Sequence, residues 1–275
     1  MSELRNRLYV GDADGVELEL PAGDVTEGVV RVGDTVRRPH RPQSYAVAAY
    51  LDHLEHVGFE GSPRYLGRDN LGRDVLTFID GDVAGAEIEE RFLGDDLLAS
   101  VARLVLKLHR ASEGYEPSDE PFPARSGATE EPEIVSHLDI TPQNLVVRDG
   151  QAFGIVDFDL AGPTTRFRDS YNAAMHWVPL LDPRDVRVGF DFNAQLRRLR
   201  VFADSYGWSA VERASIVTFG SGAAGCSWIR MKERAETEGG GWARMWSEGV
   251  GDLIRRRGQW LLDNEAAITA VLLAS

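Results

Sequence analysis

Apolar and polar residues alternate along the first 80 positions in the manner of half-buried strands. Segments that predict strands lie at 16–20, 28–32, 35–38, 64–67 and 74–79. Gly33-Asp34, between the second and third of these, is typical of a hairpin turn. The stretch 44–56 has helical spacing instead, with apolar residues three and four positions apart. The pattern predicts a small antiparallel sheet accompanied by one helix.

Helical spacing dominates the chain after residues 80–82, which we interpret as a hinge. Helices are predicted over 95–110, 169–181, 190–206, 209–236 and 241–271. Four of the twelve prolines fall between positions 112 and 133, which predicts an exposed loop there. We therefore expect an α+β fold with two parts, a strand-rich part over 1–80 and a mainly helical part over 81–275.

A second hairpin is predicted in the helical part, where two short apolar runs flank Asp149-Gly150. Folding about that turn sets Asn144 opposite Ile155. With a side-chain period of two, Asp157 then lies diagonally across from Asn144 on the same face. An amide oxygen and a carboxylate suit Mg²⁺, which keeps water and phosphate oxygens in its other positions. The open end of the hairpin is thus a candidate metal site.

The segment that begins at His137 has the spacing H-x-D-x-x-x-x-N. In the catalytic loop of kinases, the Asp of this pattern receives the proton of the acceptor hydroxyl and the Asn binds Mg²⁺. Asp139 and Asn144 occupy these positions, and Asp157 would be the main metal carboxylate. A purely structural alternative has Asp139 capping a turn, Asn144 starting a strand and Asp157 ending one. That alternative does not require these residues to occur together in this register, so we favour the catalytic interpretation.

At this point the chain resembles the aminoglycoside phosphotransferase-like kinases, small-molecule relatives of protein kinases. The motif at 137–144, followed by Ile155-Val156-Asp157-Phe158-Asp159, carries the resemblance, and the remaining coverage runs from about Leu18 to the last helices. The resemblance implies a bilobal protein-kinase-like fold, with a nucleotide-binding lobe followed by a catalytic and substrate-binding lobe. It also implies ATP as the phosphoryl donor, without excluding GTP, and Mg²⁺ as the metal.

The resemblance also implies roles for single residues of the catalytic loop. Asp139 and His137 form its catalytic part, with Asp139 as the base or acceptor-orienting carboxylate and His137 as the support that orients the loop. Asn144 and Asp157 are the expected metal ligands. Asp159 either assists the metal or makes a structural hydrogen bond.

The phosphate-binding residues depart from the pattern of the family. Gly23 lies in a loop that should cover the nucleotide phosphates, although the loop matches no glycine-rich motif. Where the family usually has a Lys on the third strand, this chain has Arg37 and Arg38. Residue spacing favours Arg37 as the replacement for this Lys, whereas the alternation of side chains along the strand leaves Arg38 as an alternative. One of the two should face the nucleotide site and the other should point to solvent.

The hinge and the helix complete the expected nucleotide site. Phe78 and Ile79 should supply backbone groups and an apolar wall to the purine. The helical Glu that would pair with the strand cation is not evident, because Val47 and Ala48 hold the expected positions. Glu55 lies near the far end of the helix.

Composition limits the partners of the protein. The 275 residues carry a formal net charge of −14, which argues against nucleic acid or an anionic membrane as a partner. The same acidity would suit a cationic substrate, for which the candidate contacts by charge alone are Asp191, Asp204, Glu236 and Glu238. With one cysteine and no signal-peptide pattern at the start of the sequence, we expect a cytoplasmic protein, as a monomer or weak homodimer.

These observations favour an ATP-dependent kinase that phosphorylates a hydroxyl of a small molecule, with an aminoglycoside-type antibiotic as the favoured acceptor and antibiotic resistance as the result. One alternative is a metabolite kinase with a choline-like, homoserine-like or sugar-like acceptor. Another is a non-catalytic, nucleotide-binding pseudokinase, which the arginines in place of Lys and the missing helical Glu would suit. The complete set Asp139, Asn144 and Asp157 argues against the pseudokinase.

Overall fold

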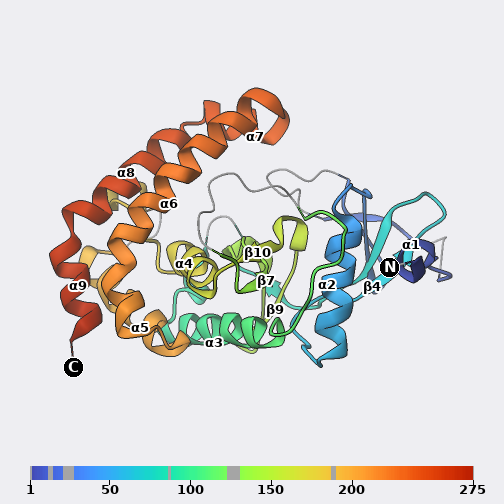
Figure 1. Cartoon of the computed structure of the whole chain (residues 1–275), viewed down its shortest axis with the longest axis horizontal. Helices are drawn as coiled ribbons and strands as arrows, with labels where there is room; N and C mark the ends of the chain where they lie inside the picture. Colours follow the sequence, from blue (N-terminus) through green and yellow to red (C-terminus); the bar gives the residue numbers. More distant parts are fainter. Residues whose placement is uncertain are drawn as a thin grey trace.

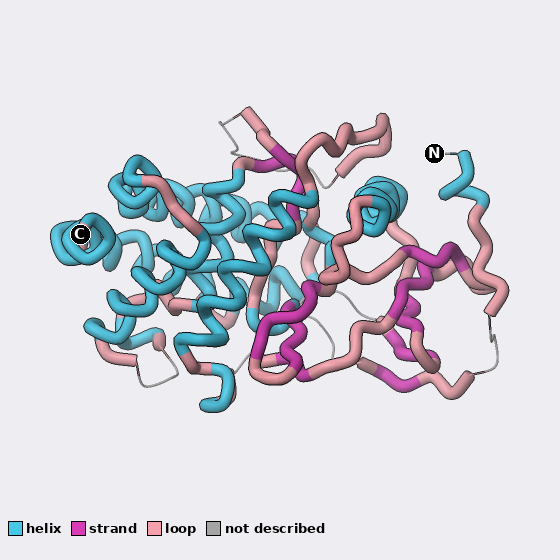
Figure 2. Tube along the Cα trace, turned by 90° about the horizontal axis from the view of Figure 1, so that it is seen from below, coloured by secondary structure: helices cyan, strands magenta, loops and turns pink. Residues whose placement is uncertain are grey.

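The chain is described by a computed structural model that covers residues 2–11, 15–20, 28–85, 88–122, 131–186 and 190–274 (Figure 1). Strands gather at one end of the molecule and helices at the other, as the tube view makes plain (Figure 2). None of the helices in the described ranges is both long and apolar enough to span a membrane.

Five antiparallel strands form the sheet of the strand-rich end, in the order β1-β2-β3-β5-β4. Their bounds are β1 Leu18–Glu19, β2 Val30–Val32, β3 Thr35–Arg38, β4 Tyr65–Arg68 and β5 Asp74–Thr77. Gly33, with a φ of 58°, makes the predicted turn between β2 and β3, a conformation that glycine adopts without strain. The short helix α1 (Ser2–Asn6) contacts α2 (Ser44–His56), which has the predicted bounds and buries Tyr50, Leu51 and Leu54.

Two smaller sheets lie between this sheet and the helices. The strands β6 (Asp82–Val83), β8 (Leu145–Arg148) and β9 (Gln151–Ile155) form one of them, and β7 (Ile134–Ser136) pairs with β10 (Gly162–Thr164) in the other. The predicted β8–β9 hairpin is present, but Asn144 does not lie opposite Ile155. The register shifts between Val146 and Val147, so Leu145 is the partner of Ile155. A bulge of this kind inserts one extra residue, which an unbroken period of two cannot anticipate.

Seven helices, among the described residues, make up most of the remaining chain. Their bounds are α3 Asp95–Ala111, α4 Arg166–Trp177, α5 Phe192–Tyr206, α6 Ala210–Thr237, α7 Gly240–Ser247, α8 Val250–Asp263 and α9 Glu265–Leu273. The single helix predicted over 241–271 was wrong, because the chain turns at Gly249, with a φ of 93°, and again at Asn264. Short 3₁₀ turns occur at Glu90–Phe92, Pro142–Asn144, Phe158–Leu160 and Pro183–Asp185.

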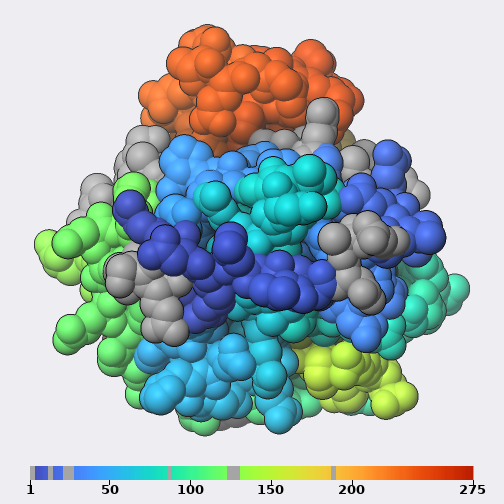
Figure 3. Space-filling view, turned by 90° about the vertical axis from the view of Figure 1, so that its right-hand side faces the viewer, coloured from blue at the N-terminus to red at the C-terminus, as the bar shows by residue number. Residues whose placement is uncertain are grey.

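Helix α3 is the central helix of the hydrophobic core. Its inner face buries Leu98, Val101, Val105 and Leu108, and the helix packs against α5 and β9. Burying each such side chain contributes roughly 1.5–3 kcal/mol relative to leaving it in water. Helix α4 packs against α3, and the antiparallel pair α6 and α8 lies on the opposite side of α4. The end of this pair where α7 connects the two helices stands above the strand-rich part when the molecule is viewed from the strand-rich end (Figure 3).

Candidate functional site

His137 ties the loop that carries Asp139 to the end of β9. The Nε2–H of His137 donates to the carbonyl oxygen of Val156 at 2.9 Å, and its Nδ1 accepts from the backbone N–H of Asp139 at 3.2 Å. One nitrogen donates and the other accepts, so the ring is the neutral tautomer. Its edge packs on Phe158, with ring centroids 4.5 Å apart. These contacts would let His137 orient the loop that carries Asp139, the role expected from the sequence.

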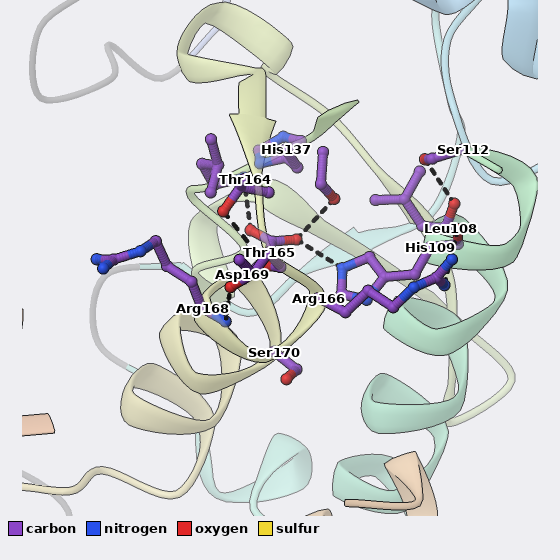
Figure 4. A network of polar contacts seen from close by, with 12 residues as sticks. Leu108, His109, Ser112, His137, Thr164, Thr165, Arg166, Arg168, Asp169 and Ser170 are labelled. Carbon is purple, nitrogen blue, oxygen red and sulfur yellow. Dashed lines mark hydrogen bonds and ion pairs between the residues drawn. The ribbon is translucent and has the colours of Figure 1, made fainter. Parts of the chain in front are cut away.

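A buried network holds the strained backbone of this loop. Leu138 has a φ of 68°, and its N–H donates to Oδ1 of Asp169 at 2.7 Å. The other carboxylate oxygen of Asp169 accepts from Ser136 Oγ at 2.7 Å and from His109 Nε2 at 2.9 Å (Figure 4). Burial alone would raise the pKa of Asp169, but the hydrogen bond and electrostatic effect of His109, together with the hydrogen bond of Ser136, outweigh it and lower that pKa. Asp169 therefore stays ionised and anchors the loop.

Asp139 and Asn144 are in direct contact at the mouth of the loop. The side-chain Nδ2 of Asn144 donates to both the carbonyl oxygen and Oδ2 of Asp139, each at 3.0 Å. The two donated bonds use only the amide nitrogen, so the amide oxygen of Asn144 can still serve as a ligand. The pair holds the Asp139 carboxylate in one orientation.

Asp157 and Asp159, in the helical part, form ion pairs with Arg38 of the strand-rich part. Asp157 follows β9 in the left-handed region, with a φ of 64°. Its Oδ1 lies 3.5 Å from Nη1 of Arg38, and Nη2 of Arg38 also forms an ion pair with Asp159. Burial raises the pKa of Asp157, and the negative charge of Asp159 raises it further, against the opposing effects of Arg38 and His137. Negative charge is thus concentrated here and favours a bound cation.

Arg37 lies on the opposite face of β3 and does not join this cluster. Its Nη1 is 3.4 Å from Oδ2 of Asp69, and its guanidinium lies 5.3 Å from the ring centre of Tyr9. Only 2% of its surface is exposed, so the prediction that the second arginine points to solvent was wrong. The backbone bridge between Leu8 and Arg68 brings the N-terminal segment over this face. Between the two candidates, the structure places Arg38 at the carboxylates.

Substitution of the two arginines should therefore have different effects. Arg37→Met is expected to lower the free energy of unfolding by about 2 kcal/mol, the scale of a lost hydrogen bond to a charged group, and to leave nucleotide binding unchanged. Arg38→Met should weaken triphosphate binding at least about tenfold while adenosine binding changes little, if Arg38 binds phosphate as expected from the sequence. Urea denaturation and calorimetry measure the two effects, with Arg38→Lys as the charge-preserving control. Equal nucleotide binding by both Met variants would contradict the assignment of Arg38.

The hinge residues Phe78 and Ile79 remain candidates for the purine contacts. The N–H of Phe78 donates to the carbonyl oxygen of Asp34 at 2.8 Å, so this one backbone group is already engaged within the sheet. Ile79 packs at Gly154 and can still form an apolar wall. Gly23 lies outside the described residues. Glu55 pairs with Arg64 at 3.4 Å, and Arg38 takes its carboxylate partners from Asp157 and Asp159 instead of from α2.

A cavity of about 370 Å³ extends from Asp139 between α4, α6, α7 and α8. Its apolar lining includes Met175, Phe219, Met231 and Trp242. The acidic residues that charge alone suggested for this pocket do not line it. Asp191 caps α5 by accepting from the N–H of Ala194, Asp204 pairs with Arg200 and Arg213, Glu236 pairs with Lys232, and Glu238 pairs with Arg234.

His176, on the cavity wall, should make the stability of the protein pH-dependent. Burial, assisted by the positive charge of Arg257, lowers the pKa of His176 to about 3. An unfolded histidine titrates near pH 6.5, so below about that pH the unfolded chain binds a proton that the folded chain does not. The free energy of unfolding should then fall, by up to about 1.4 kcal/mol per pH unit. Urea denaturation between about pH 7 and pH 5.5 tests this; an identical decline in His176→Gln would contradict it.

Comparison with known proteins identifies the family of the chain. The sequence model of the phosphotransferase enzyme family, APH, matches residues 119–202. A trifolitoxin immunity protein from Rhizobium leguminosarum bv. trifolii is 30% identical over 201 residues, which are 69% of this chain and 74% of that protein.

Solved structures share the fold at low sequence identity. A choline/ethanolamine kinase family protein from Mesorhizobium loti has a TM-score of 0.60 and 16% identity, over 95% of this chain and 94% of that one. Amicoumacin kinase hAmiN, in complex with AMP-PNP, Ca²⁺ and Ami, has a TM-score of 0.61 and 10% identity, over 95% and 91% of the two chains. The chain therefore has the bilobal, protein-kinase-like fold that the sequence predicted, and it belongs to the phosphotransferase enzyme family.

Proposed function

We propose that the protein is an ATP-dependent kinase that transfers the γ-phosphoryl group to a hydroxyl of a small molecule. The observation that carries this proposal is the position of Asp139, which lines the cavity and is joined through His137 to the strand end that presents Asp157. An acceptor in the cavity and a nucleotide beside Asp157 and Arg38 would then meet at Asp139. We assign the nucleotide to the lobe over 1–80 and the acceptor to the lobe over 81–275.

Asp139 and Arg38 have different roles in the proposed phosphoryl transfer. The Asp139 carboxylate, held by Asn144, orients the acceptor hydroxyl and accepts its proton as the hydroxyl oxygen bonds to the γ-phosphorus. The bond from the γ-phosphorus to the bridging oxygen breaks, and its electron pair leaves with ADP. Arg38 donates charge-assisted hydrogen bonds to the phosphates once it is released from Asp157 and Asp159.

The donor set of the site suits Mg²⁺. Within the described ranges no three His, Cys, Asp or Glu side chains cluster as a metal site, so a full protein cage is absent there. Asn144, Asp157 and Asp159 offer an amide oxygen and carboxylates, and Mg²⁺ is usually held by one or two carboxylates together with substrate phosphates. Burial, and after it the negative charge of Asp159, raises the pKa of Asp157, and a cation held between the two neighbouring carboxylates would offset both effects. The ion would neutralise phosphate charge when bound.

A toxin or antibiotic acceptor is favoured over a central metabolite. The relative at 30% identity is named a trifolitoxin immunity protein, and this relative carries the preference, because the solved structures with the same fold include both amicoumacin kinase and a choline/ethanolamine kinase family protein. Phosphorylation of a toxin hydroxyl would be one route to immunity or antibiotic resistance. Such a reaction uses ATP, and we propose that it takes place in the cytoplasm, without a nucleic-acid or membrane partner, in a monomer or weak homodimer.

The test is transfer of label from γ-labelled ATP, with Mg²⁺, to a panel of acceptors. The panel should contain trifolitoxin, amicoumacin, aminoglycosides, choline, ethanolamine and homoserine. A labelled product from one of the first three groups supports the proposal, whereas product from the last three indicates a metabolite kinase. Tight Mg-ATP binding with no labelled product from any acceptor, and no slow hydrolysis to ADP, would favour the pseudokinase.

A further inference from the structure

We infer that the acceptor of this enzyme is an anion, a hydroxyl compound with a carboxylate or phosphate group on an apolar body. This inference rests on the proposed function and names its substrate class. Among the residues that the structure describes, four arginines line the cavity, Arg168, Arg230, Arg234 and Arg257, and Asp139 is the only acidic one. The whole chain carries a net charge of −14, so the charge of the cavity is opposite to that of the protein as a whole.

Arg257 is the cavity residue that most clearly lacks a counter-charge. Its neighbours on α8 are both paired, Arg255 with Asp252 at 2.5 Å and Arg256 with Asp185 at 2.6 Å. Arg257 has no carboxylate within 4.0 Å among the residues that the structure describes, and its Nε is buried without a hydrogen-bond partner. Its Nη1 donates to the sulfur of Met175 at 2.8 Å, a weak acceptor. A guanidinium placed in this way is suited to a carboxylate or phosphate oxygen.

Arg230 adds a second cation on the facing helix α6. It too forms no ion pair with a described residue, and burial, followed by the positive charges of Arg234 and Arg168, lowers its pKa. Arg234 is better compensated, by Glu238 at 3.5 Å and by the ring of Trp242, 4.6 Å from its guanidinium. A bound anion would supply the counter-charge that the described protein groups around Arg230 and Arg257 do not.

A neutral donor stands beside these cations. The hydroxyl of Tyr171 is buried without a partner among the described residues and lines the same cavity. Burial raises the pKa of Tyr171 to about 12, with a small opposing effect of Arg257, so the hydroxyl keeps its proton and can donate to an oxyanion. The remaining wall of Met175, Phe219, Met231 and Trp242 suits an apolar body. A polycationic aminoglycoside would instead face like charges, so within the toxin and antibiotic acceptors of the proposed function this inference selects anionic compounds over aminoglycosides.

The experiment uses probes that share a benzoyl ring and a hydroxyl and carry an anionic, neutral or cationic group at the same position. They are N-benzoyl-L-serine, its phosphonate analogue, its uncharged amide and its cationic 2-aminoethyl amide, each titrated into the full-length protein by calorimetry. The anionic probes should bind at least about tenfold more tightly than the cationic one, the scale of a charge-assisted contact. The ratio of the two anions shows whether carboxylate or phosphate is preferred. Equal affinity of all probes, or no binding of either anion below about 5 mM, overturns the inference.

Variants separate a designed anion site from general electrostatic attraction. Arg257→Met and Arg230→Met should each reduce the preference for the anionic probes about tenfold or more. Arg255→Met removes the same charge from the exposed face of α8 and should leave the preference unchanged. If Arg255→Met reduces it as strongly as Arg257→Met, the effect is one of net charge and the inference is wrong.

A parallel titration with Mg-ATP distinguishes this inference from the proposed function. Arg257→Met should bind Mg-ATP like the parent, because Arg257 lies on the acceptor side of Asp139. A parent protein that selects the anionic probes but does not bind Mg-ATP would refute the kinase and leave the anion site standing. A parent that binds Mg-ATP and selects no anion would refute the anion site alone.

Discussion

Asp139→Asn is expected to lower turnover by at least about 10²-fold, the contribution of a general base, while Mg-ATP affinity stays within about twofold of the parent. The substitution is nearly isosteric. An asparagine oxygen can still accept the hydrogen bond from Nδ2 of Asn144 that Oδ2 of Asp139 accepts at 3.0 Å. The change therefore removes the charge and the proton acceptor and keeps the geometry. Single-turnover rates and calorimetry measure the two quantities on the acceptor that the labelled-ATP panel identifies.

The matched control for this prediction is Glu60→Ala, which removes one exposed carboxylate far along the chain from the loop. It should retain the turnover of the parent. A parent-like rate in Asp139→Asn would place the base elsewhere or leave Asp139 with a positioning role only. Loss of both turnover and Mg-ATP affinity would indicate that the loop has collapsed, and a melting temperature below that of the parent would confirm the collapse.

Local patterns predicted the elements of the fold well and their exact pairing less well. Helix α2 has the predicted bounds Ser44–His56, because its apolar spacing and the glycine beyond its end act within a few residues. The β8–β9 hairpin also forms where its turn residues predicted it. Its register differs by one residue near Asn144, since a bulge depends on the neighbouring strand and packing as well as on the turn.

The arginines of β3 show the same limit at the level of one strand. Alternation correctly placed Arg37 and Arg38 on opposite faces. It could not show that Tyr9 and Asp69 cover the face of Arg37, since both are distant in sequence. The solvent-exposed arginine of the prediction is therefore a buried one.

The charge of the cavity beside Asp139 could not be predicted from the chain as a whole. Its arginines come from three separate helices, α4, α6 and α8, and meet only in the folded protein. The acidic candidates chosen by charge instead cap a helix or pair with nearby arginine and lysine residues. Net charge reports mostly on the exposed surface, whereas substrate selection depends on the few groups that line the cavity.

Asp169 anchors the loop that carries Asp139, and the sequence did not identify it in this structural role. Its two carboxylate oxygens join Leu138, Ser136 and His109, which lie on three different segments. A histidine near the end of an apolar helix was the available signal, because a buried imidazole needs a hydrogen-bond partner. The identity of that partner depends on the tertiary fold.

Asp157→Asn should reduce the dependence of nucleotide affinity on Mg²⁺ at least about tenfold, the lower end of what a metal-site residue contributes. Asparagine is the informative substitution here, because Asp157 has a φ of 64°, a conformation that asparagine tolerates and alanine adopts only with strain. The substitution removes one of the two negative charges of the Asp157–Asp159 pair and keeps the backbone conformation. In the absence of Mg²⁺ the variant should bind ATP at least as well as the parent, since one repulsive carboxylate near the phosphates has gone. Calorimetric titration of ATP with and without Mg²⁺ gives both values, and an Mg²⁺ effect equal to that of the parent would remove Asp157 from the metal site.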